Sequence, residues 1–480
     1  MKKLLGTTLA LAMFIPAGAN AELFKNLKVS GNLDIQTTSA RNVTDFVTRP
    51  NAGVIAAVAG NNNDRIGHAT TRVIVKMDWD LLDDVHSRVT LVKGAEGVLV
   101  NTTRTYGSNP QTVNQIQDTT VVQEANVKID KVFGLLDVTA GRQFYGEEGD
   151  LIVYYGPRDA YGLRVDALDI FRADWNGEHM SVTGIAGKTA DGTVGQVGWE
   201  AAATDLRGVV ISCKMHEMVK PSLYVYNRVT HGQGGLGVTT NETNGAVTGK
   251  NTNLWVAGLK AKITTGGLTA HVEGAMNRGE DRTTARNTSY KGWALLAKAA
   301  YKLDLSDAGM ITPWGEYGYG TGDSNGTWAG NRNFQAINTD YRPGGIYGRF
   351  DNASAEVLGN AVAGFGGSSN GLSNRIIWGV GVKATPAALN KLTVGAAFYR
   401  YAFNRLSDNG NASGTNAATR HSRNIGSELD VTAEWKHSEN VSLKATAGSF
   451  KPGAYVADVK GANAALNPAV MLAGDVAIKF

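Results

Sequence analysis

The feature that most constrains this chain is a period-two alternation of apolar and polar residues that recurs along its length. In the stretch from 71 to 79, odd positions carry Val73, Val75, Met77 and Trp79, and even positions are mostly charged. A β-strand directs alternate side chains to opposite faces, whereas a helix would scatter them around its axis. The stretch is therefore predicted to be a strand with one apolar and one charged face.

About 18 segments share this pattern, a number typical of porin-like barrels. They begin near Leu27, His68, Val85, Thr120, Leu135, Tyr161, His179, Ala201, Pro221, Thr252, Gly267, Tyr290, Met310, Asn374, Lys391, Ile425, Val441 and Ala469. Short connections follow even-numbered segments, and the long connections, rich in Asn, Gly, Thr and Ser, follow odd-numbered ones. Because outer-membrane barrels have short periplasmic turns and long extracellular loops, we predict an all-β, transmembrane antiparallel β-barrel of about 18 strands with periplasmic N- and C-termini.

The N-terminus has the features of an export signal. Two lysines precede an apolar run over 4–17, and residues 19–21 read Ala-Asn-Ala, which is an A-x-A cleavage site. The run is shorter than the roughly 20 residues that a spanning helix needs, so a signal peptide over 1–21 is favoured over an N-terminal anchor. Residues 22–480 are expected to form a single barrel domain, because no linker or low-complexity tract divides them.

Composition and motifs exclude several functional classes. The 47 Lys and Arg residues nearly balance the 43 Asp and Glu residues, and a net charge of +4 is too weak to indicate nucleic-acid binding. Cys213 is the only cysteine, which excludes an intrachain disulfide and a Cys-cluster metal site. No G-x-S-x-G, H-E-x-x-H or P-loop motif is present, so we expect no enzyme activity, no cofactor and no metal.

Several short motifs resemble the alginate-export family of outer-membrane porins. In chain order they are Gly-Arg-Gln at 141–143, Tyr-Gly-Glu-Glu-Gly-Asp at 145–150, Arg-Asp-Ala-Tyr-Gly-Leu-Arg-Val at 158–165, Tyr-Gly-Tyr-Gly-Thr-Gly-Asp at 317–323, Phe-Gln at 334–335, Tyr-Arg-Pro-Gly at 341–344 and Gly-Ser-Glu-Leu-Asp at 426–430. The resemblance covers roughly residues 135 to 450 and implies an 18-stranded monomeric barrel that passes an anionic or polar solute. The chain departs from the strongly basic lumen of that family's exporters, so the resemblance does not establish alginate as the solute.

The charged faces of the predicted strands would line the lumen, where positive and negative side chains nearly cancel. Such a wall favours neutral or mixed-charge small solutes, with a local constriction that prefers anions. The candidate pore-lining cations are Arg142, Arg158, Arg164, Arg172, Arg72, Lys76, Arg88 and Lys128, of which the first four are the best candidates for a constriction because an arginine fork suits carboxylates. Strict alternation places Arg142 on the lipid side, and only a bulge would reverse that. The alternative is that these charges merely pair across strands.

The expected function is a passive diffusion channel in the outer membrane of a bacterium for small polar or anionic solutes, including sugars or sugar acids. Its partners would be outer-membrane lipid and the solute. Three alternatives stay open: an exporter of an anionic polysaccharide, a structural or adhesive surface barrel, and a barrel enzyme. The long connection from Thr321 to Ser373 could fold into the lumen or form a mobile surface lid.

Overall fold

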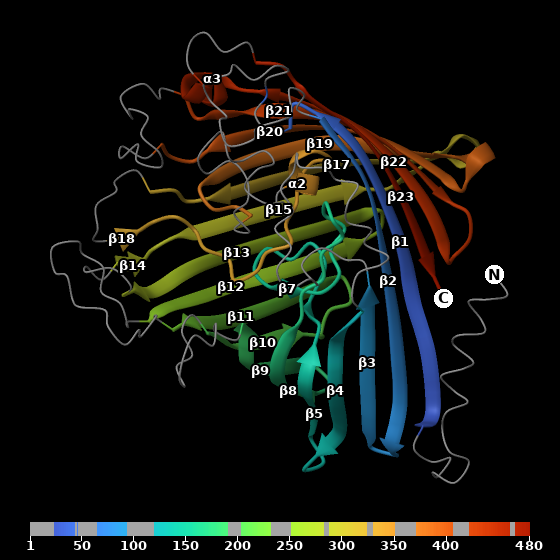
Figure 1. Cartoon of the computed structure of the whole chain (residues 1–480), viewed down its shortest axis with the longest axis vertical. Helices are drawn as coiled ribbons and strands as arrows, with labels where there is room; N and C mark the ends of the chain where they lie inside the picture. The colour runs from blue at the N-terminus through green and yellow to red at the C-terminus, as the bar shows by residue number, and fades with distance from the viewer. Residues whose placement is uncertain are drawn as a thin grey trace.

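The computed structural model describes residues 24–43, 46, 65–93, 120–190, 203–231, 251–282, 288–323, 330–350, 371–406, 422–460 and 466–480. The described strands run around a large barrel, and short segments lie inside it (Figure 1). The predicted signal peptide and most of the long connections fall outside these residues. None of the helices in the described ranges has the length and apolar character needed to cross a bilayer.

Eighteen antiparallel strands form the wall, each paired with the next along the chain, and β1 pairs with β23 to close the ring. Their bounds are β1 Lys25–Arg41, β2 Arg65–Leu82, β3 Val85–Lys93, β4 Val121–Val132, β5 Leu136–Gln143, β8 Leu168–Asn176, β9 Met180–Ala190, β10 Thr204–Cys213, β11 Val219–Thr230, β12 Thr252–Thr265, β13 Leu268–Asp281, β15 Trp293–Tyr301, β17 Gly309–Gly320, β19 Arg375–Pro386, β20 Leu392–Phe403, β21 Asn424–Lys436, β22 Val441–Pro452 and β23 Ala469–Lys479. The predicted antiparallel β-barrel and its number of strands are therefore confirmed. Closure removes the exposed edges that an open sheet would leave.

Short elements lie between the wall strands along the chain. Within the connections, β6 Tyr145–Gly146 pairs with β7 Tyr154–Tyr155, and β14 Thr288–Tyr290 pairs in parallel with β18 Gly330–Asn331. The remaining short pieces are β16 Leu303–Asp304, η4 Ser306–Ala308, α2 Tyr347–Phe350, η5 Ala387–Leu389 and α3 Ala454–Lys460. Two of these elements, β14 and β16, extend the pairing of β13 and β17.

The predicted starts of the strands lie within three residues of the observed starts in every case but the sixth. That strand was expected near Tyr161 and begins at Leu168 as β8. Tyr161 is 5% exposed and its amide donates to the carbonyl of Arg349, in the connection between β17 and β19. The alternating residues near Tyr161 therefore belong to the connection between β5 and β8, which lies inside the barrel, and not to a wall strand.

The two faces of the wall differ in the way the alternation predicted. On β21, Leu429 and Val431 are each 54% exposed, whereas Glu428 and Asp430 are 1% and 3% exposed. The apolar positions face outward, where lipid would cover them, and the acidic positions face the barrel interior. This inversion of a soluble protein's pattern is expected of a barrel that is surrounded by hydrocarbon.

The core of the protein lies inside the barrel and is supplied largely by two connections. We call residues 144–167, between β5 and β8, the first inward segment, and residues 332–350, between β17 and β19, the second inward segment. Leu151 and Ile152 of the first segment and Phe334 of the second are at most 1% exposed. In Figure 1, β7 and α2 mark the two segments in the interior of the ring. The long connection at 321–373 was predicted either to fold into the lumen or to form a surface lid. Its described part enters the lumen.

Candidate functional site

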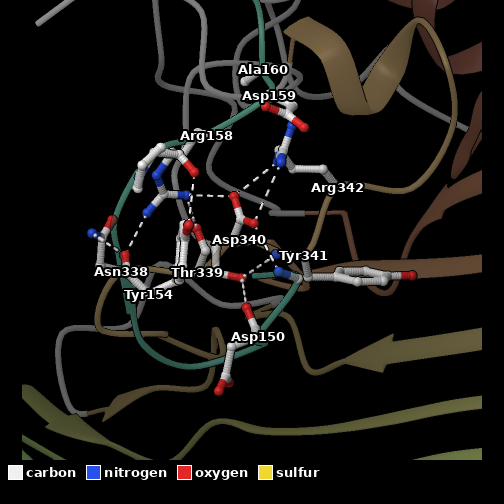
Figure 2. A network of polar contacts seen from close by, with 12 residues as sticks. Asp150, Tyr154, Arg158, Asp159, Ala160, Asn338, Thr339, Asp340, Tyr341 and Arg342 are labelled. Carbon is white, nitrogen blue, oxygen red and sulfur yellow. Dashed lines mark hydrogen bonds and ion pairs between the residues drawn. The ribbon is translucent and has the colours of Figure 1, made fainter. Parts of the chain in front are cut away.

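The two inward segments are joined by a buried ion pair between Arg158 and Asp340 (Figure 2). Arg158 Nη1 lies 3.0 Å from Asp340 Oδ1 and donates at 2.6 Å to the carbonyl of Thr339. The side chain of Arg158 is 2% exposed and that of Asp340 is 0% exposed. Arg342 also lies 2.9 Å from Asp340, and Asp166 lies 3.3 Å from Arg158, so the buried charges compensate one another within a cluster of four residues.

Further hydrogen bonds make this junction rigid. Arg158 Nη2 donates to the carbonyl of Tyr154, which also accepts the side-chain amide of Asn338 (Figure 2). The backbone amide of Tyr154 donates to the carbonyl of Asn338. The second carboxylate oxygen of Asp340 accepts the amide of Gly149 at 2.8 Å. The amide of Asp340 donates to the carbonyl of Asp150. The two segments therefore act as one body across the lumen.

Arg72 on β2 fastens the first inward segment to the wall. Its Nε and Nη2 donate to Asp34 on β1 at 2.9 and 2.8 Å, and its Nη1 donates to the carbonyls of Arg158 and Leu163. The carboxylate neutralises the buried guanidinium, and the remaining donors capture the loop backbone. On the opposite side of the same segment, Lys260 of β12 lies 2.9 Å from Asp150.

Acidic residues of the wall hold the second inward segment. Glu428 of β21 accepts the amides of Ile346 and Tyr347, and Asp430 accepts the amide of Gly345 at 2.8 Å. Arg349 reaches the wall at Asp475 of β23, with contacts of 2.7 and 3.2 Å. Wall charges that looked like solute contacts in the sequence are thus partly used to position the segments that narrow the pore.

A polar cavity of about 360 Å³ lies between the inward segments and the part of the wall formed by β4, β5 and β9 to β11. Its lining includes Arg164 and Asp166 from the first segment, Asn338 from the second, and Arg228 from β11. Arg228 donates from Nη1 to the carbonyl of Ile337 at 3.1 Å, and its Nε has no acceptor among the described residues. The hydroxyls of Thr189, Thr204 and Thr230 also border the cavity. These groups are suited to a small solute with acceptor oxygens.

Seven of the eight predicted pore-lining cations divide into three groups. Arg164 and Arg172 are 46% and 36% exposed, and each pairs with an aspartate two residues further along, at 2.8 and 2.7 Å. Among the wall residues, Arg88 pairs with Asp78 at 2.6 Å, Lys128 pairs with Asp130 at 2.6 Å, and Lys76 is partly exposed on the same inward face. The alternative that these charges pair locally therefore describes several of them. Arg72 and Arg158 are the buried anchors described above.

Arg142 is the exception in this set. It lies opposite Ala125 on β4 and Asp169 on β8, and its Nη1 contacts the Asp169 carboxylate at 2.6 Å. Asp169 alternates with the buried Leu168 and Ile170 and shares the outward face with Phe171, which is 54% exposed. Arg142 therefore lies on the outer face of the wall, as strict alternation predicted. Its side chain also contributes to the lining of the cavity.

Arg228 and Asp340 are not among the residues predicted from the sequence. Arg228 occupies an even position after Tyr224 and Tyr226, which are both buried on the inner face, so the alternation alone could have placed it. Asp340 precedes the Tyr-Arg-Pro-Gly motif in an irregular connection, where no periodicity indicates which residues meet. In the described ranges, no group of three or more His, Cys, Asp or Glu residues could hold a metal ion.

A closed antiparallel barrel with a polar lumen, narrowed by inward connections, defines a porin-type outer-membrane β-barrel. The sequence model of the alginate export family matches residues 200–469, which is more than half of the chain. The chain belongs to the alginate export family, and the resemblance inferred from its motifs is confirmed. No curated protein sequence matches it.

Solved structures of porins from Pseudomonas aeruginosa have a similar fold. OpdL is 9% identical with a TM-score of 0.53, covering 94% of this chain and 98% of its own. OccD3 (OpdP) is 12% identical with a TM-score of 0.52, covering 98% and 97%. OpdK, solved with vanillate, is 11% identical with a TM-score of 0.52, covering 95% and 99%. At these identities the likeness concerns the fold, which extends over the whole barrel.

Proposed function

We propose that this protein is a passive diffusion channel of the bacterial outer membrane for small polar or anionic solutes. The observation that carries the proposal is the cavity inside a closed barrel, where Arg164 and Arg228 lie beside threonine hydroxyls. A guanidinium presents a planar fork of donors to carboxylates, and hydroxyls suit sugar-like groups. The solute class therefore includes sugar acids and other small carboxylates.

The arrangement of the connections supports an orientation for the channel. The short turns all lie at one end of the barrel, and we place that end, with both chain termini, in the periplasm. The long connections then face outward from the cell. The mature protein would start at Glu22 and act as a monomer, with the inward segments narrowing each barrel separately.

Single-channel recording of the purified mature protein in planar bilayers tests this function. We expect stepwise ion conductance and a reversal potential in a salt gradient that shows a modest preference for anions. Small carboxylates such as glucuronate should reduce the current in a concentration-dependent way. A protein that inserts into the bilayer without conducting would favour an adhesive barrel or a barrel enzyme instead.

Export of an anionic polysaccharide is the second candidate, and the family match favours it. The interlocked segments count against it, because a polymer needs a continuous path and the Arg158–Asp340 junction spans the lumen. Mannuronate oligomers of increasing length distinguish the two functions. A diffusion channel should lose affinity or show no gain as the chain lengthens, whereas an exporter should bind longer oligomers more tightly through added contacts.

A further inference from the structure

Three cations on the outward face of the wall have no role in the lumen. They are Arg400 on β20, Lys451 on β22 and Arg41 on β1, and all three are exposed. Each lies close to the end of its strand that leads into a long connection. No acidic side chain of the described residues forms an ion pair with any of them. Charges at the edge of a lipid-facing surface need an explanation, since nothing in the pore contacts them.

The strand register places two of these cations around a hydroxyl. Ser427 on β21 lies opposite Arg400 on one side and opposite Lys451 on the other. Neighbouring strands are about 4.8 Å apart, so the Cα atoms of Arg400 and Lys451 are roughly 10 Å apart. Two long side chains at that spacing can close on one tetrahedral anion, and the serine hydroxyl lies between them. Charge-assisted hydrogen bonds of this kind are the strong ones.

The surroundings of the pair indicate where its ligand would be located. Trp378 lies opposite Arg400, and its ring is 5.5 Å from that of Phe398, two residues before Arg400. One row further from the rim, Leu429 is 54% exposed on the same face. An aromatic pair beside cations and above an apolar surface is typical of the boundary between hydrocarbon and headgroups.

We propose that Arg400, Ser427 and Lys451 bind a phosphate group on the headgroup of a surrounding lipid, with Arg41 as a third cation beside them. Across neighbouring strands, Leu429 pairs with Ser449, Ser449 with Val470, and Val470 with Arg41. Arg41 on β1 therefore lies two strands away from Lys451 on β22. A phosphorylated glycolipid of the outer leaflet has the required charge and depth. The assignment rests on the proposed orientation, in which this end of the barrel lies in the outer leaflet.

The test measures lipid binding to the purified full-length mature barrel by native mass spectrometry and by the lipid-dependent shift in thermal unfolding. The probes are bisphosphorylated lipid A, the same lipid without its phosphates, and inorganic phosphate, all in EDTA. The wild type should retain the phosphorylated lipid and not its dephosphorylated form. The double variant R400Q/K451Q should bind it at least about tenfold more weakly, as expected for two lost charged contacts.

A matched control is R207Q, which removes an exposed cation from the outward face of β10, where Ala186 and Asn227 lie opposite. It should bind lipid A like the wild type. Three outcomes would overturn the proposal. R400Q/K451Q could bind lipid A as tightly as the wild type, the wild type could bind the dephosphorylated lipid equally well, or inorganic phosphate could displace lipid A at a similar concentration. Conductance is recorded for the same samples: a variant that loses lipid but conducts normally supports the site, and a non-conducting wild type contradicts only the channel function.

Discussion

Arg158 and Asp340 are 182 positions apart in the sequence and form a 3.0 Å contact in the interior of the barrel. The contact joins two connections that leave the wall at β5 and β17 and return at β8 and β19. A barrel of 18 strands is too wide for its own wall side chains to fill. The inward segments supply the missing packing and thereby set the shape of the passage.

We predict that R158Q will loosen this junction. Removing one partner of a buried ion pair costs about 3–5 kcal/mol when the other charge is left uncompensated. Asp340 keeps its 2.9 Å contact with Arg342, so we expect the cost of R158Q to lie below that range. The inward segments should then separate, and single-channel conductance and current noise should rise. The closed wall should persist, which circular dichroism checks. R207Q, on the outward face of β10, is the control and should conduct like the wild type. An equal conductance for R158Q and wild type would contradict the junction's role.

The double variant R164E/R172E should shift the channel's preference toward cations. Both side chains are partly exposed to the lumen, and each already lies beside an aspartate, so the change leaves a cluster of negative charge. Reversal potentials in a potassium chloride gradient measure the shift. R142E should have a smaller effect, since that side chain starts from the outer face of the wall. An unchanged reversal potential in the double variant would show that the solute path avoids these arginines.

The channel's preference for anions should increase as the pH falls. The increase should begin at a pH above the usual pKa range of a carboxyl group. Partial desolvation within the first inward segment, with the charge of Asp159 close by, raises the pKa of Glu148 from its ordinary value of 4.5. A raised pKa means that the proton is taken up at a higher pH, so a negative charge is lost from the lumen earlier in an acid titration. Reversal potentials between pH 7 and pH 4 follow this change. In E148Q that early part of the titration should be smaller than in the wild type, and an unchanged titration would assign it to other groups.

G344A should displace the second inward segment. Gly344 has a φ of 86°, and a Cβ atom there would lie 2.2 Å from the Tyr401 hydroxyl and 2.8 Å from the Glu428 carboxylate. Strain and overpacking of this kind cost about 1–3 kcal/mol each. We expect altered conductance and faster proteolysis of the segment. Gly134 provides the control, because it also has a positive φ, 75°, but has open space around it. If G134A and G344A behave alike, contacts with Glu428 do not fix the segment.

The sequence by itself determined the wall. Alternation assigns each residue to one of two faces, and it located 17 of the 18 strand starts within three residues, since hydrocarbon outside and water inside impose the same rule on every strand. It also placed Arg72, Glu428 and Asp430 on the inner face. Only the tertiary structure decided what these residues contact. Connections that fold back into the lumen have no periodicity, and their partners, such as Arg158 with Asp340 and Gly345 with Asp430, come from distant strands that only ring closure brings together.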